Sequence, residues 1–250
     1  MTDFIIGSEL VEARDAQRLN IPAKRLMEKL GPIPSTVDDL KRRWFWELLQ
    51  NASDYNETVD VILELSEDVV VFKHNGNPFR AIDTENLIAP DSGKDDQEIR
   101  SIDMIGQFGT GFISTHVLSF RITVAGVIRS EKEESQFAQF KFDLNRKEYQ
   151  DKEKLKESIA ASSSQLEKSL ELITYNSTLF NTSFTYHLKE NIAGLDSTAI
   201  VADGLAYVMD MLPYTLSCMP KIQSVKILNH GVGSFLPGET FISILNRNDD

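Results

Sequence analysis

Two polar residues, Glu47 and Asn51, stand four positions apart in the otherwise apolar segment WFWELLQNASD. In a helix this spacing places both side chains on one face, close enough to contact one ligand. An amide oxygen suits Mg²⁺, which binds through few protein groups together with phosphates and water. A carboxylate one turn away can accept the proton of an attacking water. The pair therefore indicates a phosphate-hydrolysing site, with a solvated Glu47 and an Asn51 that merely caps the chain as the open alternative.

A second chemical feature is the glycine-rich segment IGQFGTGF, at residues 105–112. A glycine-rich turn that runs into a helix points backbone N–H groups outward, and the helix dipole favours an anion there. A tight turn without a ligand would use the same residues. The presence of Glu47 and Asn51 upstream favours phosphate binding over that alternative.

A third feature is the segment HNGNPF, at residues 74–79, which follows a predicted strand. Gly76 permits a close approach of the backbone to a ligand, or a positive φ angle. A simple turn at the end of the strand would explain the segment equally well when it is taken alone.

Regular elements must position these segments, and hydrophobic periodicity predicts both helices and strands. Helices are expected at residues 8–30 (with a break near 20–22), from Ser35 or Thr36 to about 54, and at 112–118, 151–172 (softened at 162–164) and 199–212, where Pro213 would end the last one. Strands are expected at 59–65, 69–72, 121–128, 137–142, 183–188, 222–228 and 241–245, the last two forming a hairpin. Residues 83–104 are polar and rich in turn formers, which predicts a long loop of the kind that serves as a lid.

The bulk composition limits the function classes. The chain has 250 residues, 26% of them charged, and a net charge of −12, so broad nucleic-acid binding is not expected. No segment resembles a membrane span or a secretory signal. The single cysteine, Cys218, is expected to pack as a small hydrophobe, which fits a reducing, cytoplasmic location.

Taken together, the segments resemble the GHKL or Bergerat-fold ATPases, a superfamily that includes gyrase-type topoisomerases, ninety-kilodalton heat-shock chaperones and histidine kinases. The resemblance is carried, in this order, by ELLQNASD, HNGNPF, IGQFGTGF and NTSFTYHLKE at residues 181–190. IGQFGTGFISTHVLS looks similar to the heat-shock-chaperone and sacsin-like branches, and HNGNPF and LPYTLSCMPKIQSVKIL look similar to the sacsin-like group. The resemblance covers roughly residues 40–228.

The resemblance implies a role for each matched residue. Glu47 would be the general base, Asn51 would coordinate the Mg²⁺ that bridges the phosphates, and Asp54 would line the nucleotide pocket. Gly76 would let the backbone approach adenine, and Thr182 would hydrogen-bond nearby. Further contacts to ATP or ADP are implied for His74, Asn75 and Phe79, and, around the phosphates, for Gly106, Gln107, Phe108, Gly109, Thr110, Gly111 and Phe112. Residues 83–104 would form the lid that closes over ATP.

One residue departs from the pattern of that superfamily. An aspartate usually stands at the position of His74, where its carboxylate accepts a proton of the adenine amino group. A neutral imidazole has one acceptor nitrogen and could replace that bond, whereas a protonated one could not. Asn75 is another candidate acceptor.

The implied fold is α/β, an α+β two-layer sandwich of the Bergerat type with a mixed, mostly antiparallel sheet and helices on one face. We expect an N-terminal helical arm at 1–34, an ATP-binding domain at 35–228, and a C-terminal hairpin at 229–250 that begins a further region of a longer protein. The expected function is slow Mg-ATP hydrolysis that drives lid closure or dimerisation. A nucleotide-sensing module with little turnover and a scaffold that has lost nucleotide binding are the alternatives. Expected partners are the nucleotide, a second copy of the chain and further domains of the same chain, but no membrane.

Overall fold

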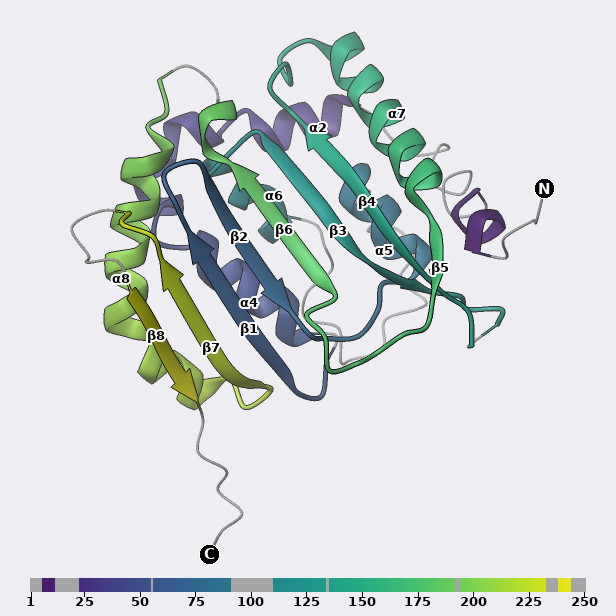
Figure 1. Cartoon of the computed structure of the whole chain (residues 1–250). Helices are drawn as coiled ribbons and strands as arrows, with labels where there is room; N and C mark the ends of the chain where they lie inside the picture. The colour runs from purple at the N-terminus through teal and green to yellow at the C-terminus, as the bar shows by residue number, and fades with distance from the viewer. Residues whose placement is uncertain are drawn as a thin grey trace, which may run out of the picture.

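The computed structural model describes residues 6–11, 23–54, 56–90, 110–133, 135–191, 194–232 and 238–243. Its described strands form one eight-stranded sheet in the order β5-β4-β3-β6-β2-β1-β7-β8 (Figure 1). The strands are β1 (Val59–Leu65), β2 (Val69–His74), β3 (Arg121–Arg129), β4 (Phe137–Asn145), β5 (Glu171–Ile173), β6 (Thr182–His187), β7 (Ile222–Asn229) and β8 (Gly238–Ser243). Strands β1 and β7 pair in parallel and the other neighbours are antiparallel. The expected α/β fold with a mixed, mostly antiparallel sheet is therefore confirmed.

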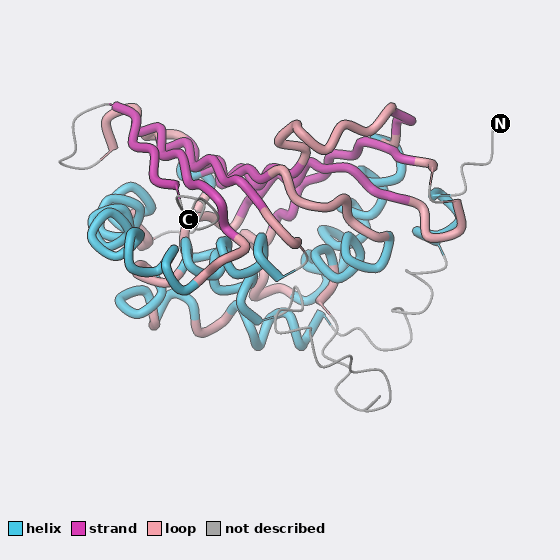
Figure 2. The backbone as a smooth tube through the Cα atoms, turned by 90° about the horizontal axis from the view of Figure 1, so that it is seen from below, coloured by secondary structure: helices cyan, strands magenta, loops and turns pink. Residues whose placement is uncertain are grey.

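The helices gather on one side of this sheet (Figure 2). They are residues 6–11, α2 (Ala23–Leu30), α3 (Val37–Leu40), α4 (Trp44–Asp54), α5 (Ala81–Ile88), α6 (Thr110–Ser114), α7 (Lys152–Ser169) and α8 (Ser197–Cys218), with 3₁₀ turns η1 (Ile33–Ser35), η2 (Thr115–Val117) and η3 (Leu188–Glu190). Along β1, buried residues alternate with half-exposed ones. Antiparallel sheets commonly pack one face on the core and leave the other to solvent. The buried face of the sheet is thus the one that the helices cover.

The N-terminal segment packs onto its own chain. Ile6 and Leu10 are fully buried and belong to the same hydrophobic core as Leu26 and Leu30 of α2. The Glu9 carboxylate accepts hydrogen bonds from the Ser130 hydroxyl and the Lys132 N–H, which lie just beyond β3. Within the described residues, the predicted N-terminal arm therefore contacts the body of the molecule.

The helix expected from residue 35 to 54 is two helices. Thr36 precedes α3, as predicted, but α3 ends at Leu40 and a turn separates it from α4. The turn brings Trp44 against α8, where its indole contacts Gly204. On the same turn, the Lys41 ammonium binds the carboxylates of Asp38 and Asp203. Contacts with α8, far away in the sequence, therefore set the start of α4.

Three other expected boundaries are wrong. Helix α8 does not stop at Pro213 but continues to Cys218, because Leu212 and Leu216, on either side of the proline, are both buried in the core. Helix α7 passes through residues 162–164 without a break, and the Ser162 hydroxyl binds the carbonyls of Ser158 and Asp143. The first part of the expected lid, residues 83–88, belongs to α5 and is largely buried; residues 91–104 lie outside the described residues.

Cys218 also departs from expectation. It is exposed rather than packed in the core. It ends α8 two residues after Leu216, so it has turned away from the buried face of that helix.

The contact between α4 and α8 requires a glycine. A Cβ atom added to Gly204 would overlap the Trp44 indole nitrogen and the Lys41 carbonyl oxygen, both of which are buried against it. The replacement Gly204→Ala should therefore lower the free energy of unfolding by about 1–3 kcal/mol, since overpacking outweighs the gain in helix propensity. Urea unfolding followed by tryptophan fluorescence measures this. The exposed Ala206→Ser on the same helix should change stability by less than about 0.5 kcal/mol, and an equally small effect of Gly204→Ala would contradict the tight contact.

Candidate functional site

Helix α4 carries three polar residues, Glu47, Asn51 and Asp54, along one face. Their spacing of four and three residues aligns them in a row. A second face is apolar and lies in the core, through Trp44, Phe45, Leu48, Leu49 and Ala52, while Gln50 is exposed. Packing of the apolar residues thus fixes the direction in which the polar row points. The prediction that Glu47 and Asn51 share one face of a helix is confirmed.

Glu47 lies against the end of the glycine-rich segment. One carboxylate oxygen accepts a hydrogen bond from the Arg43 guanidinium at 2.8 Å, and its side chain is 16% exposed. The other oxygen is so close to the Gly111 Cα that a Cβ atom there would overlap it. The fold therefore places Glu47 in contact with Gly111, although the two residues are 64 positions apart in the sequence.

Asn51 and Asp54 carry polar atoms without partners. The Asn51 Nδ2 and the Asp54 Oδ2 are buried and have no hydrogen-bond partner within the described part of the chain. Burial raises the pKa of the Asp54 carboxyl, and the positive charge of Lys221 opposes that shift. Buried polar groups are nearly always hydrogen-bonded, so each unpaired group calls for an explanation such as water, an ion or a ligand. Two of them in one row on α4 indicate a ligand surface.

Of the glycine-rich segment, the structure describes Thr110 onward, whereas Gly106, Gln107, Phe108 and Gly109 lie outside the described residues. Thr110 and Gly111 begin α6, which confirms that the segment runs into a helix. Phe112 is buried and its ring packs at 5.3 Å from that of Phe184 on β6. Phe112 therefore fixes α6 to the sheet from within the core.

His74 and Thr182 meet on the buried face of the sheet. They lie directly opposite each other, at the end of β2 and the start of β6, and both are buried. Such cross-strand neighbours have Cβ atoms roughly 5 Å apart. The structure thus brings together two residues that are 108 positions apart and that the resemblance assigns to the base.

The His74 ring is neutral and held in one orientation. Its Nδ1 accepts a hydrogen bond from the Gly76 backbone N–H at 3.2 Å, and the ring meets that of Phe72 edge-on at 6.1 Å. Burial lowers its pKa to about 4, since the charged imidazolium would lose its hydration. At neutral pH His74 is therefore uncharged.

Gly76 faces a residue that the sequence did not single out. A Cβ atom at Gly76 would overlap the side-chain amide of Asn56. That amide donates to the Ala52 carbonyl of α4 and accepts from the Asn77 N–H. Asn56 thus ties the end of α4 to the loop after β2. An asparagine just past a helix end is the signal that could have found it, because its short amide often binds nearby backbone groups there.

Two predicted site residues have other partners. Asn75 accepts from the Asp60 N–H at 2.7 Å and donates to the Asp60 carboxylate, so its amide links the loop after β2 to β1. Phe79 is buried, exchanges backbone hydrogen bonds with Val127 and Arg129 of β3, and packs on another phenylalanine ring. A contact of either residue with a nucleotide stays a prediction.

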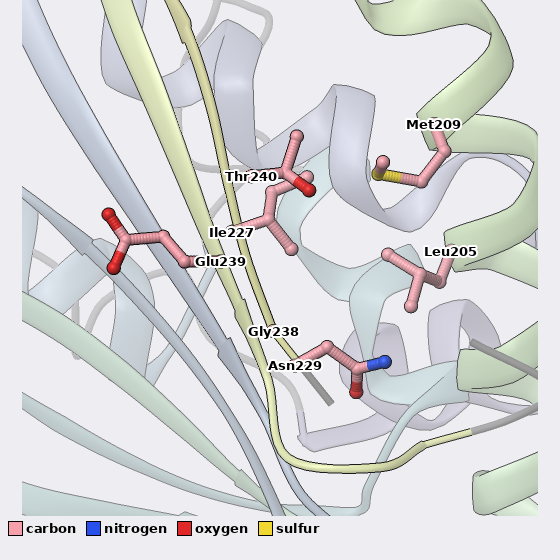
Figure 3. Close-up of a pocket in the computed structure, with 7 residues that line it drawn as sticks. All are labelled: Leu205, Met209, Ile227, Asn229, Gly238, Glu239 and Thr240. Carbon is pink, nitrogen blue, oxygen red and sulfur yellow. The ribbon is translucent and has the colours of Figure 1, made fainter. Parts of the chain in front are cut away.

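A cavity of about 250 Å³ lies elsewhere, between α8 and the β7–β8 hairpin (Figure 3). Leu205 and Met209 of α8 line one side, and Ile227 and Asn229 of β7 line the other. The Asn229 side-chain oxygen accepts hydrogen bonds from the N–H groups of residues 231 and 232, and its amide nitrogen donates to the carbonyl of residue 232. None of the predicted site residues that the structure describes lines this cavity, so we do not assign the site to it.

The described residues hold no cluster of three or more histidine, cysteine, aspartate or glutamate side chains that could bind a metal by themselves. None of the helices that the structure describes has the length and apolar character to cross a membrane.

No family model matches the chain, and no curated protein matches it.

The neutral His74 makes stability depend on pH. Its folded pKa of about 4 lies below the ordinary imidazole pKa of 6.5, so the unfolded chain binds the proton first and stability falls as the pH drops from 6.5 towards 4. The replacement His74→Asn, whose Oδ1 can still accept from Gly76, should remove about 1 kcal/mol per pH unit of this loss between pH 6 and 4.5. Urea unfolding at a series of pH values measures the slope. His116, also buried with a pKa lowered to about 3, remains in both proteins, and identical slopes would show that His74 is not neutral in the folded state.

Proposed function

We propose that this chain is a Mg²⁺-dependent nucleoside triphosphatase domain of the GHKL or Bergerat type, with ATP as the substrate that its sequence segments imply. The observation that carries the proposal is the row of Glu47, Asn51 and Asp54 on α4, in which two buried polar atoms have no partner in the described chain and Glu47 contacts Gly111. A nucleotide with its phosphates towards the glycine-rich segment would supply partners for these groups.

Asn51 and the phosphates would hold Mg²⁺. The amide oxygen is a hard ligand, and a site with a single protein group suits a cation that keeps its waters and binds phosphate oxygens. Mg²⁺ would neutralise negative charge on the phosphates. The unpaired Nδ2 of Asn51 fits the same arrangement, because an amide that binds a cation through oxygen leaves its N–H groups for a phosphate or water.

Glu47 would act as the general base. The oxygen that contacts Gly111 faces the place where the glycine-rich segment enters α6, and Arg43 holds the other oxygen in position. A water held by Glu47 would attack the terminal phosphorus, its proton would pass to the carboxylate, and the bond to the nucleoside diphosphate would break. Positioning and charge stabilisation provide most of the rate in such reactions.

The rigid supports of the site favour this arrangement. Helix α6 is fixed by the Phe112–Phe184 contact and by the buried hydrogen bond from the Tyr186 hydroxyl to Thr115 at 2.8 Å. Helix α4 is fixed by its apolar faces and by Asn56. Catalytic groups held on packed elements keep the geometry that the reaction needs.

The replacement Glu47→Gln tests the assignment. Glutamine keeps an oxygen for Arg43 but cannot accept the proton, so steady-state phosphate release from Mg-ATP should fall about 100-fold or more. Nucleotide affinity, measured by calorimetry, should change little. Exposed Glu57→Gln serves as the matched control and should retain the wild-type rate.

The same measurements separate the alternatives. Equal phosphate release by wild type and Glu47→Gln would remove Glu47 from the mechanism. Nucleotide binding by the wild type without turnover would favour a nucleotide-sensing module over an enzyme. The absence of any affinity for ATP or ADP, with and without Mg²⁺, would leave only a scaffold that does not bind nucleotides.

A further inference from the structure

We propose that this chain binds an extended, basic peptide segment of a partner protein at the cavity between α8 and β8. The segment pairs with the free edge of β8 and places one large apolar side chain in the cavity. The inference is independent of the proposed nucleotide site, because none of the described residues assigned to that site lines the cavity.

The two edges of the sheet are built differently. Strand β5 forms one edge with only three residues, whereas β8 forms the other edge with six. Natural proteins protect an edge by keeping the strand short or by placing charges, above all lysine, or proline on it. The sequence of β8, GETFIS, has neither lysine nor proline, and its one charge, Glu239, forms an ion pair with Lys226 at 2.8 Å. In the described part of the chain, β8 therefore leaves one row of main-chain groups ready to pair with another strand.

A cavity of about 250 Å³ lies directly beside this edge (Figure 3). Thr240 of β8 pairs with Ile227 of β7, and Gly238 pairs with Asn229. Ile227 and Asn229 are buried on the face of the sheet that the helices cover, so their partners on β8 lie on that face too. One partner has no side chain and the other has a small one. The cavity exists because these two residues leave the space beside α8 unfilled.

The walls of the cavity suit an apolar side chain. Leu205 and Met209, four positions apart on α8, form one wall, and Ile227 lies across from them. The Asn229 amide already has hydrogen-bond partners on the backbone of residues 231 and 232, so it needs none from a ligand. An apolar cavity of about 150 Å³ binds benzene, so this larger volume accommodates a leucine, methionine or phenylalanine side chain.

The cavity reaches the surface at the strand edge. Gly238 and Glu239, which line it, are both exposed. Figure 3 shows the Glu239 side chain pointing away from α8, so it does not close the opening. An extended peptide uses both features, because its backbone pairs with the edge while alternate side chains point towards the helix. A small molecule would fill the cavity and leave the edge unpaired.

Charge around the cavity gives the character of the flanking residues. Asp210, which follows Met209 on α8, is exposed and has no ion-pair partner within the described ranges. The whole chain has 38 acidic and 26 basic residues, and thus a net charge of −12. Lysine or arginine beside the apolar residue of the segment is therefore attracted. The same charge disfavours a second copy of this acidic chain as the occupant.

The fluorescein-labelled peptide KTLTLTK is the probe, and fluorescence anisotropy with the full chain measures its binding. In a strand its leucines lie on one face and its threonines on the other. The matched peptide KTSTSTK keeps the length and the charge but has no large apolar side chain. It should bind at least about tenfold more weakly, since burial of one leucine side chain provides an affinity of that size.

Methylation of the peptide backbone separates strand pairing from simple apolar contact. Adjacent N–H groups of a strand point to opposite sides, so a methyl group on the nitrogen of the fourth or of the fifth residue blocks only one edge of the peptide. One of these two forms of KTLTLTK should therefore bind about tenfold more weakly, and the other should bind like the parent peptide. Equal binding of both forms would exclude pairing with β8.

Two variants of β8 place the same ring on opposite faces of the strand. The replacement Thr240→Phe fills the cavity and should weaken the binding of KTLTLTK at least about tenfold. The matched control Glu239→Phe points away from the cavity and should stay within about threefold of wild type. Far-ultraviolet circular dichroism and urea unfolding establish that both variants are folded.

Each remaining outcome decides the matter. Binding of KTLTLTK that the serine peptide and Thr240→Phe both lose supports the inference. No binding of KTLTLTK, or equal binding of the serine peptide, overturns it. A dimer in sedimentation velocity that Thr240→Phe dissociates would assign the cavity to a second copy and would also overturn it. Nucleotide binding, measured by calorimetry, should be the same in wild type and Thr240→Phe, so a failure here leaves the proposed function untouched.

Discussion

The burial of α4 against the sheet and beside α8 is the constraint on which the candidate site depends. Five of its residues, from Trp44 to Ala52, lie in the hydrophobic core, so the helix cannot rotate without exposing them. A face beside the buried one carries Glu47, Asn51 and Asp54. Because the core fixes that face, their polar atoms are held away from bulk water even where no side chain pairs with them. Such unpaired groups cost stability in the isolated chain, which a ligand would recover.

The loop after β2 is held by a second set of contacts that involves side-chain amides. Asn75 fastens the loop to β1 through Asp60, and Asn56 fastens it to the end of α4 through Asn77. Gly76 fits between them because it has no side chain. These bonds place the Gly76 N–H beside the imidazole of His74 and so decide which of its nitrogens is free. A backbone N–H two residues further along the chain thus fixes Nδ1 of His74 as the acceptor.

Sequence patterns predicted those parts of the molecule that local chemistry governs. The alternation of apolar residues located β1 and β2, and the spacing of Glu47 and Asn51 placed them on one helical face. Local patterns failed where distant segments decided the outcome. Pro213 does not end α8 because the core holds the helix on both sides of it, and the polar residues 83–88 form a buried helix because neighbouring elements cover them. Asn56 was missed because its role depends on the N–H of Asn77, which is 21 residues away.

The sequence by itself determined the polar row on α4 and the strands β1 and β2, since each follows from residue type and period. Only the tertiary structure decided which residues meet: Glu47 with Gly111, and His74 with Thr182. It also gave Asn75 a partner on β1 and Phe79 partners on β3, and it buried the His74 ring in its neutral form. The physical reason is that these contacts and this burial depend on neighbours that are distant in sequence, and no local pattern of residue types contains them.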